Sequence, residues 1–105
     1  MIVTGWNNGA HEANGAGYGV RLDAADRDVY FKRDWENIIL EVEGSPDSIT
    51  VNVAKPSFWG TNCRELINIE IGRWLIRNDL APWKKGYPPS LSLIPINSNH
   101  FLLRK

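Results

Sequence analysis

One helical pattern, between Phe58 and Trp83, limits how much of this chain can be helix. On a 3.6-residue period its apolar side chains form one broad stripe, which is typical of a helix with a buried face. The stripe consists of Cys63, Leu66, Ile67, Ile71, Trp74 and Leu75. Ile69 and Ile76 flank Gly72 on a second, narrower stripe. Because glycine costs about 1 kcal/mol relative to alanine inside a helix, we expect another backbone to approach closely at Gly72.

The two ends of this helix carry recognisable signals. Asn62 is followed three residues later by Glu65, which has the form of a capping box and predicts that the helix begins at Asn62. Pro82 disfavours helical geometry for the residue before it, so the helix is expected to end at Asn78 or Asp79.

All other apolar segments are short and typical of strands. Residues 49–53 alternate strictly between apolar and polar side chains, and a turn at 44–48 joins them to residues 37–43, which predicts an antiparallel hairpin. Further strands are expected at residues 2–6, 18–22, 91–94 and 101–103. A short helix is expected at residues 24–31, with Asp23 as its cap and with Val29, Tyr30 and Phe31 as its packing residues. Short turns between few helices favour one domain, residues 1–105, with a β-dominated α+β fold. We expect a partly open antiparallel pseudobarrel with one short and one long helix.

Charge and composition exclude several classes of function. Twelve basic and twelve acidic residues cancel, so binding to nucleic acid would have to come from a local patch. One cysteine and two distant histidines provide neither a disulfide nor a structural zinc site, and no cofactor is expected. No stretch approaches the ~20 apolar residues of a membrane span, and the first residues are not those of a secretory signal, so we expect a cytoplasmic protein with no membrane partner.

Two stretches resemble a known family. Residues 17–31 follow a loop rich in Asn and Gly and run from an alternating segment into a short helix that ends in an aromatic residue. Residues 71–80 contain a Gly-Arg-Trp helix, and residues 91–93 and 97–101 follow it as two strands. Both stretches resemble the B3-like DNA-binding pseudobarrel of plant transcription factors and of the effector domains of some restriction endonucleases. The resemblance implies a non-catalytic domain whose partner is double-stranded DNA.

The resemblance also implies where DNA would be held, because the two gripping loops of the family correspond to about residues 6–14 and 54–64 here. Asparagine can pair with adenine through its donor and acceptor, whereas the second loop suits phosphate contacts and one guanine contact from Arg64. The candidate residues are Asn7, Asn8, His11 and Asn14 in the first loop, and Lys55, Ser57, Trp59, Thr61, Asn62 and Arg64 in the second. Lys84, Lys85, Arg104 and Lys105 could add phosphate contacts if they lie on the same side. Simpler alternatives are turn residues at Asn7 and Asn8, a helix cap at Asn62 and a core position at Trp59.

Two other functions stay open. The segment at residues 83–89 is basic and aromatic and could dock a protein partner, such as a nuclease, in a protein-interaction module. A small cysteine-dependent enzyme is the third hypothesis, because Cys63 beside Arg64 in a first helical turn would favour the thiolate. Such an enzyme would need His11 or His100 as a base, and the place of Cys63 on the apolar stripe favours an inert buried thiol instead.

Overall fold

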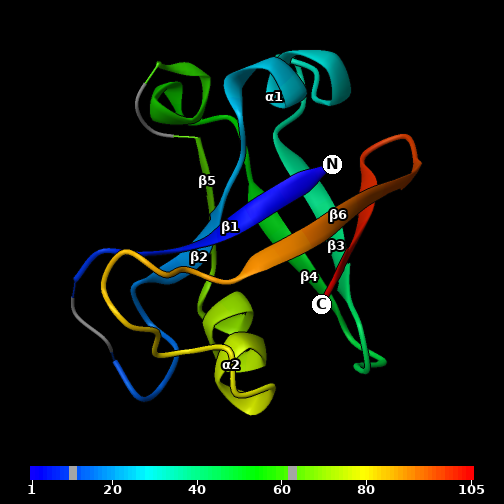
Figure 1. The fold of residues 1–105 in the computed structure, drawn as a ribbon. Helices are drawn as coiled ribbons and strands as arrows, with labels where there is room; N and C mark the ends of the chain where they lie inside the picture. The colour runs from blue at the N-terminus through cyan, green and yellow to red at the C-terminus, as the bar shows by residue number, and fades with distance from the viewer. Residues whose placement is uncertain (10–11, 62–63) are drawn as a thin grey trace.

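Seven strands form a single sheet that curls into a nearly closed barrel, with one α-helix at each end (Figure 1). The computed structural model describes residues 1–9, 12–61 and 64–105. The strands are β1 (Ile2–Asn7), β2 (Tyr18–Arg21), β3 (Asn37–Val42), β4 (Ser48–Asn52), β5 (Glu65–Ile67), β6 (Ser90–Asn97) and β7 (His100–Arg104). The helices are α1 (Ala24–Tyr30), the 3-10 turn η1 (Pro56–Trp59) and α2 (Ile69–Arg77). None of the helices in the described ranges is long and apolar enough to cross a membrane.

The strands lie in the order β4-β3-β7-β6-β1-β2-β5, which confirms the β-dominated pseudobarrel predicted from the sequence. Neighbouring strands are antiparallel except β3 and β7, which are parallel because the β6–β7 hairpin folds back onto β3. The two edge strands, β4 and β5, approach each other through one side chain. Asn68, just after β5, donates a hydrogen bond from Nδ2 to the carbonyl oxygen of Thr50 in β4 (3.2 Å).

The inside of the barrel is filled by alternating strand residues and a cluster of aromatic rings. Residues 49, 51 and 53 point inward, as the alternation predicts. Phe31 stacks on Phe101 with ring centroids 4.7 Å apart, and Phe58 tilts against Phe31 at 5.3 Å. These rings come from the end of α1, from β7 and from η1, so they join three segments that are distant in the sequence.

The second helix begins later than the sequence predicts. Glu65, expected in its first turn, is a strand residue opposite Arg21, and Ile67, expected on the buried stripe, is 38% exposed. The prediction was wrong because pairing with β2 satisfies the backbone groups of β5, an option that no local signal reports. The actual N-cap is Asn68, whose Oδ1 accepts a hydrogen bond from the backbone N–H of Glu70 (2.8 Å).

Other parts of the helix prediction are confirmed. The helix ends at Arg77 with Asn78 as its C-cap. A Cβ on Gly72 would lie 2.7 Å from the carbonyl carbon of Gly15, so the expected close backbone is the β1–β2 loop. Asn62 and Cys63, assigned to the start of the helix, lie outside the described residues.

The first helix differs from its prediction in which side chains it buries. Val29 and Tyr30, expected to pack, are 73% and 42% exposed, and only Phe31 reaches the core. Asp23 occupies the N-cap, but its side chain makes no capping hydrogen bond. The buried residue of α1 is instead Arg27, at 5% exposure, because its guanidinium binds backbone carbonyl groups of a neighbouring segment.

Candidate nucleic-acid interface

The segment between β4 and β5 is held in shape by Arg27. Its Nη1 donates to the carbonyl oxygens of Phe58 (3.0 Å) and Gly60 (2.6 Å), and its Nε contacts Asp28 (3.0 Å). The carbonyl groups at the end of a 3-10 turn lack partners within the turn, and a guanidinium fork can satisfy two of them. Residues 53–61 are therefore fastened to α1.

Trp59 lies in this segment between core and solvent. Its Nε1 donates to the carbonyl oxygen of Val53 (3.1 Å), and its ring packs edge-on against Phe58 at 5.4 Å. The guanidinium groups of Arg33 and Arg27 lie 4.8 and 5.3 Å from its ring centroid, which is the geometry of a cation–π interaction. Trp59 is half-buried, so only part of the ring can meet a ligand.

Arg64, the candidate for a guanine contact, is partly engaged within the protein. Its Nε donates to the carbonyl oxygen of Leu22 (2.9 Å), and its Nη1 donates to that of Thr61. These bonds fasten the second loop to the end of β2 and fix the direction of the guanidinium. Its remaining N–H donors, on Nη1 and Nη2, can still reach a phosphate or a base edge that lies in that direction.

Other candidates in the second loop are open to solvent. Ser57 and Thr61 are exposed and Lys55 is half-buried, so all three can reach a ligand. Asn62 is one of the two residues of this loop that lie outside the described ranges.

In the first loop, asparagine side chains form turns. Oδ1 of Asn7 accepts from the backbone N–H of Gly9 (2.8 Å), and Oδ1 of Asn14 accepts from that of Ala16 (3.0 Å). The side chain of Asn8 lies against Gly17. Each of these turn bonds uses one acceptor position of the amide oxygen and fixes the orientation of the amide, so a base contact would have to match that orientation. His11, the fourth candidate, lies outside the described residues.

The basic segment at residues 83–89 lies against the first loop. Trp83 packs edge-on against Tyr18 with centroids 5.6 Å apart. A hollow of about 340 Å³ lies between loop and segment and is lined by Asn7, Gly9, Trp83, Lys85 and Gly86. The sequence did not indicate this contact, which brings exposed lysines beside the first loop.

Both candidate loops leave the same side of the barrel (Figure 1). They lie at opposite ends of β2, because Tyr18 pairs with Asn7 near the first loop and Arg21 pairs with Glu65 near the second. The loops thus flank the outer face of β2 and β5 and are separated by the length of a four-residue strand.

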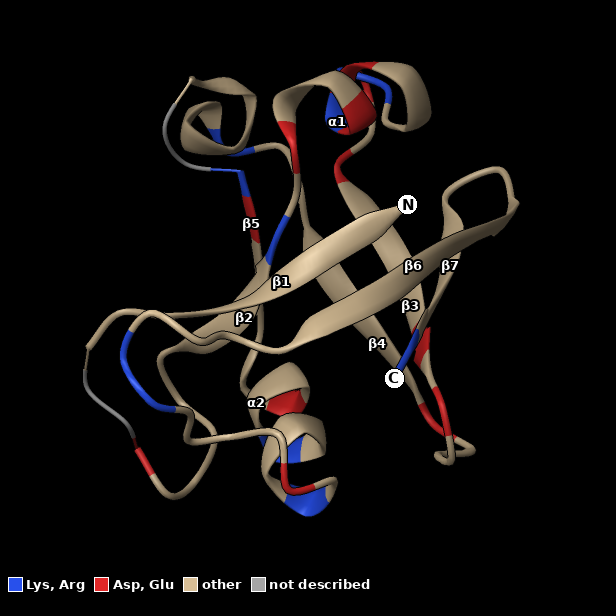
Figure 2. Cartoon of the chain, viewed as in Figure 1, with Lys and Arg blue, Asp and Glu red and all other residues tan. Residues whose placement is uncertain are grey.

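Charge of both signs is spread over the barrel. Figure 2 shows basic segments on the β4–β5 connection, on β2 and on the segment before β6, and acidic segments on α1 and at the β3–β4 turn. Acidic residues also occur beside the basic segments, where Glu65 pairs with Arg21 (3.8 Å) and Glu12 lies in the first loop. The basic C-terminal residues lie near the acidic β3–β4 turn, because Arg104 pairs with Glu43 (3.8 Å).

The described residues do not test the hypothesis of a cysteine-dependent enzyme, because Cys63 and His11 lie outside them. His100 lies in β7. Within 1–9, 12–61 and 64–105, no group of three or more His, Cys, Asp or Glu residues could hold a metal ion.

The fold and the two loops define a small barrel with a polar, partly basic side. Comparisons with protein-family models, with curated proteins and with solved structures found no match for this chain. A functional assignment therefore rests on the chemistry of this side of the barrel.

Proposed function

We propose that the chain is a non-catalytic, B3-like domain that binds double-stranded DNA with the loops at about residues 6–14 and 54–64. The observation that supports the proposal most is the position of five basic side chains in a chain with no net charge. Lys55 and Arg64 lie in the second loop, Arg21 lies on β2 between the loops, and Lys84 and Lys85 lie beside the first loop. A local patch of this kind is what a neutral protein needs in order to attract phosphates.

The lysines of this side supply the phosphate contacts in the proposal. Lys84 and Lys85 are exposed beside the first loop, and Lys55 is half-buried in the second. Each phosphate that a lysine neutralises releases counterions and contributes about −0.9 to the slope of log K against log salt. Arg64, with its backbone bonds, would add a contact of fixed direction.

The stiffness of the second loop favours binding as well. Arg27 and Arg64 hold residues 58–61 through backbone carbonyl groups, so little conformational entropy would be lost when the loop meets DNA. Among the described candidates of this loop, Ser57 and Thr61 are exposed and can meet base edges, and hydroxyl groups discriminate bases weakly. We therefore expect phosphate contacts to contribute more to the affinity for DNA than base contacts do.

The test is a titration of the protein with duplex DNA at salt concentrations between about 50 and 200 mM. The triple variant Lys55→Gln, Lys84→Gln, Lys85→Gln should bind more weakly and reduce the salt slope by about 2.7, or 0.9 for each lysine. A matched control removes three charges from other parts of the surface. It carries Arg77→Gln, Arg104→Gln and Lys105→Gln, all three beside the β3–β4 turn. Equal losses in both triple variants, or no binding at low salt, would contradict the proposal.

A protein-interaction module is the second candidate, and one observation favours it. Tyr87 is 71% exposed, and the Nζ atom of Lys84 lies 5.7 Å from its ring centroid. Exposed tyrosine is typical of interface anchors. Binding to a protein partner such as a nuclease would be weakly dependent on salt and would be lost in Tyr87→Ala, whereas DNA binding would survive that change.

A further inference from the structure

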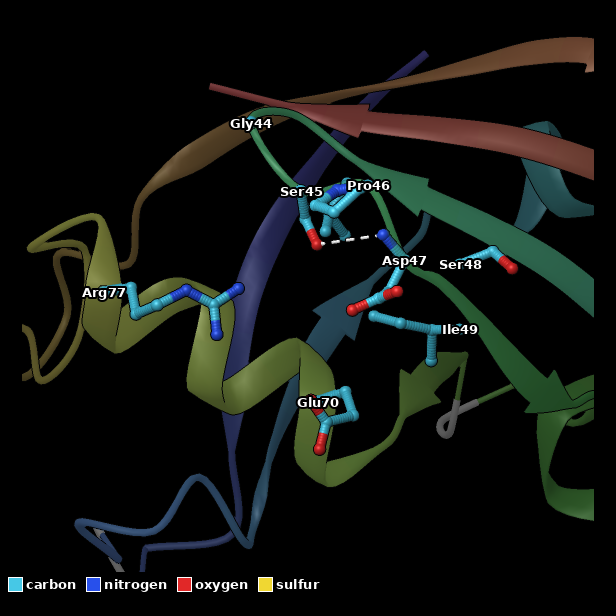
Figure 3. A pocket seen from close by; sticks show the side chains of 9 residues that line it. Gly44, Ser45, Pro46, Asp47, Ser48, Ile49, Glu70 and Arg77 are labelled. Atoms are coloured by element: carbon cyan, nitrogen blue, oxygen red, sulfur yellow. Dashed lines mark hydrogen bonds between the residues drawn. The ribbon is translucent and has the colours of Figure 1, made fainter.

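A second, larger hollow lies between the acidic β3–β4 turn and α2. Its volume is about 500 Å³, within the range of small-molecule sites. It belongs to neither candidate loop, and the resemblance to B3-like domains implies no function for it. Figure 3 shows the side chains that line it.

The hollow has a mixed lining. Val42 and Ile49 are buried core residues that show only their edges in its wall, and Pro46 adds a ring from the turn. The charged groups are Arg77 and Glu70 from α2 and Asp47 from the turn. The lining is more polar than apolar, so a ligand would be held mainly through its polar groups.

Two of the three charged groups are exposed to solvent and lack a protein partner among the described residues. Glu70 is engaged, because its Oε1 accepts a hydrogen bond from Arg73. Within the described part of the chain, Arg77 forms neither a hydrogen bond nor an ion pair, and the carboxylate of Asp47 forms none either. In Figure 3 the guanidinium of Arg77 extends from α2 toward the carboxylate of Asp47, and the two groups face each other without contact.

This arrangement selects a type of ligand. An arginine with no partner prefers a carboxylate or a phosphate, which it can bind through two parallel hydrogen bonds. Asp47 would repel a plain anion but would attract an ammonium group. A ligand with both charges satisfies Arg77 and Asp47 together, and a small aliphatic body can contact Pro46 and the exposed edges of Val42 and Ile49.

We propose that this pocket binds a small zwitterion with an apolar body, of the class of aliphatic α-amino acids. The carboxylate of the ligand binds Arg77, its ammonium group binds Asp47, and its side chain lies on Val42 and Ile49. The proposal does not depend on DNA binding, because the pocket and the candidate loops share no residue.

The test uses leucine as the probe and follows backbone amide signals of the full chain by NMR. Leucine should shift the signals of residues 45–49 and 77 in a saturable way, with a millimolar or tighter dissociation constant. Two comparators each lack one charge: isocaproate has no ammonium group, and isoamylamine has no carboxylate. Each should bind at least about tenfold more weakly than leucine, because a charged hydrogen-bond partner is left unmatched.

Two variants separate the roles of the charges. Arg77→Gln and Asp47→Asn should each weaken leucine binding at least about tenfold, and Asp47→Asn should strengthen isocaproate binding because the repulsion is removed. Lys32→Gln, which removes one exposed charge at the end of α1, should change nothing. The proposal is overturned if leucine shifts no signal in this region, if isocaproate binds as tightly as leucine, or if Arg77→Gln binds leucine like the wild type.

Discussion

Replacing Arg27 with methionine tests whether this buried cation holds the second loop in place. Methionine keeps an unbranched apolar stem in the same space but leaves the carbonyl oxygens of Phe58 and Gly60 without their donor. An unsatisfied buried polar group costs about 1–3 kcal/mol, and the bond to Gly60 is only partly buried, so we expect a loss of about 2–4 kcal/mol in the free energy of unfolding. For a domain of this size the loss corresponds to a drop of about 10–20 °C in Tm.

The assay is urea unfolding followed by circular dichroism, together with a thermal melt. Arg33→Met is the matched control, because Arg33 is exposed and its interaction in the structure is the cation–π contact with Trp59. It should cost less than about 1 kcal/mol. If Arg27→Met unfolds within 1 kcal/mol of wild type, or no more easily than Arg33→Met, the two backbone bonds do not carry the role assigned to Arg27.

Three further changes test the packing of the barrel, each by urea unfolding. Gly72→Ala should destabilise the protein by about 2 kcal/mol or more, because overpacking costs about 3 kcal/mol and the gain in helix propensity is only about 1 kcal/mol. The control Gly60→Ala should be tolerated, because a methyl group there meets only ordinary contacts. Asn68→Ala should cost about 1 kcal/mol for the lost N-cap, and an unchanged midpoint would contradict the role of that cap. Phe31→Ala should cost about 3–5 kcal/mol, while Val29→Ser at its exposed position should stay within about 0.5 kcal/mol, and similar costs for both would contradict the burial described for α1.

The parts of the fold that the sequence predicts are those with local signals. The β3–β4 hairpin is predicted because alternation and turn chemistry lie within one stretch of chain. The close approach at Gly72 is predicted because a helical glycine has a local cost, although its neighbour, Gly15, is visible only in the structure. β5 was missed because its three residues become a strand only by pairing with β2. The N-cap actually used, Asn68, was missed because Ile71 stands three residues later, where a capping box has Glu or Gln, whereas Asn62 is followed by Glu65.

The candidate site shows the same distinction between roles that local sequence signals predict and roles that only the tertiary fold creates. The turn role of Asn7 was predicted from residue type, since asparagine readily bonds its own backbone, whereas the same role of Asn14 was not predicted. The engagement of Arg27 and Arg64 could not be predicted, because a charged side chain near a helix is normally solvated and only the tertiary fold supplies the carbonyl groups. Nor did any pattern bring Arg77 together with Asp47, which lie on different elements around the larger hollow.

The barrel is weakest between its two edge strands, β4 and β5, where the amide of Asn68 forms a bridge. Its Oδ1 begins α2 while its Nδ2 bonds to Thr50, so one side chain spans the gap between the edge strands. Among the described residues no backbone ladder joins β4 to β5, whereas the other neighbouring strands share one. Local opening should start along this line, and amides of β4 that face it should exchange with solvent before those of the central strands β6 and β7. The barrel thus has a seam, closed by a side chain rather than by backbone.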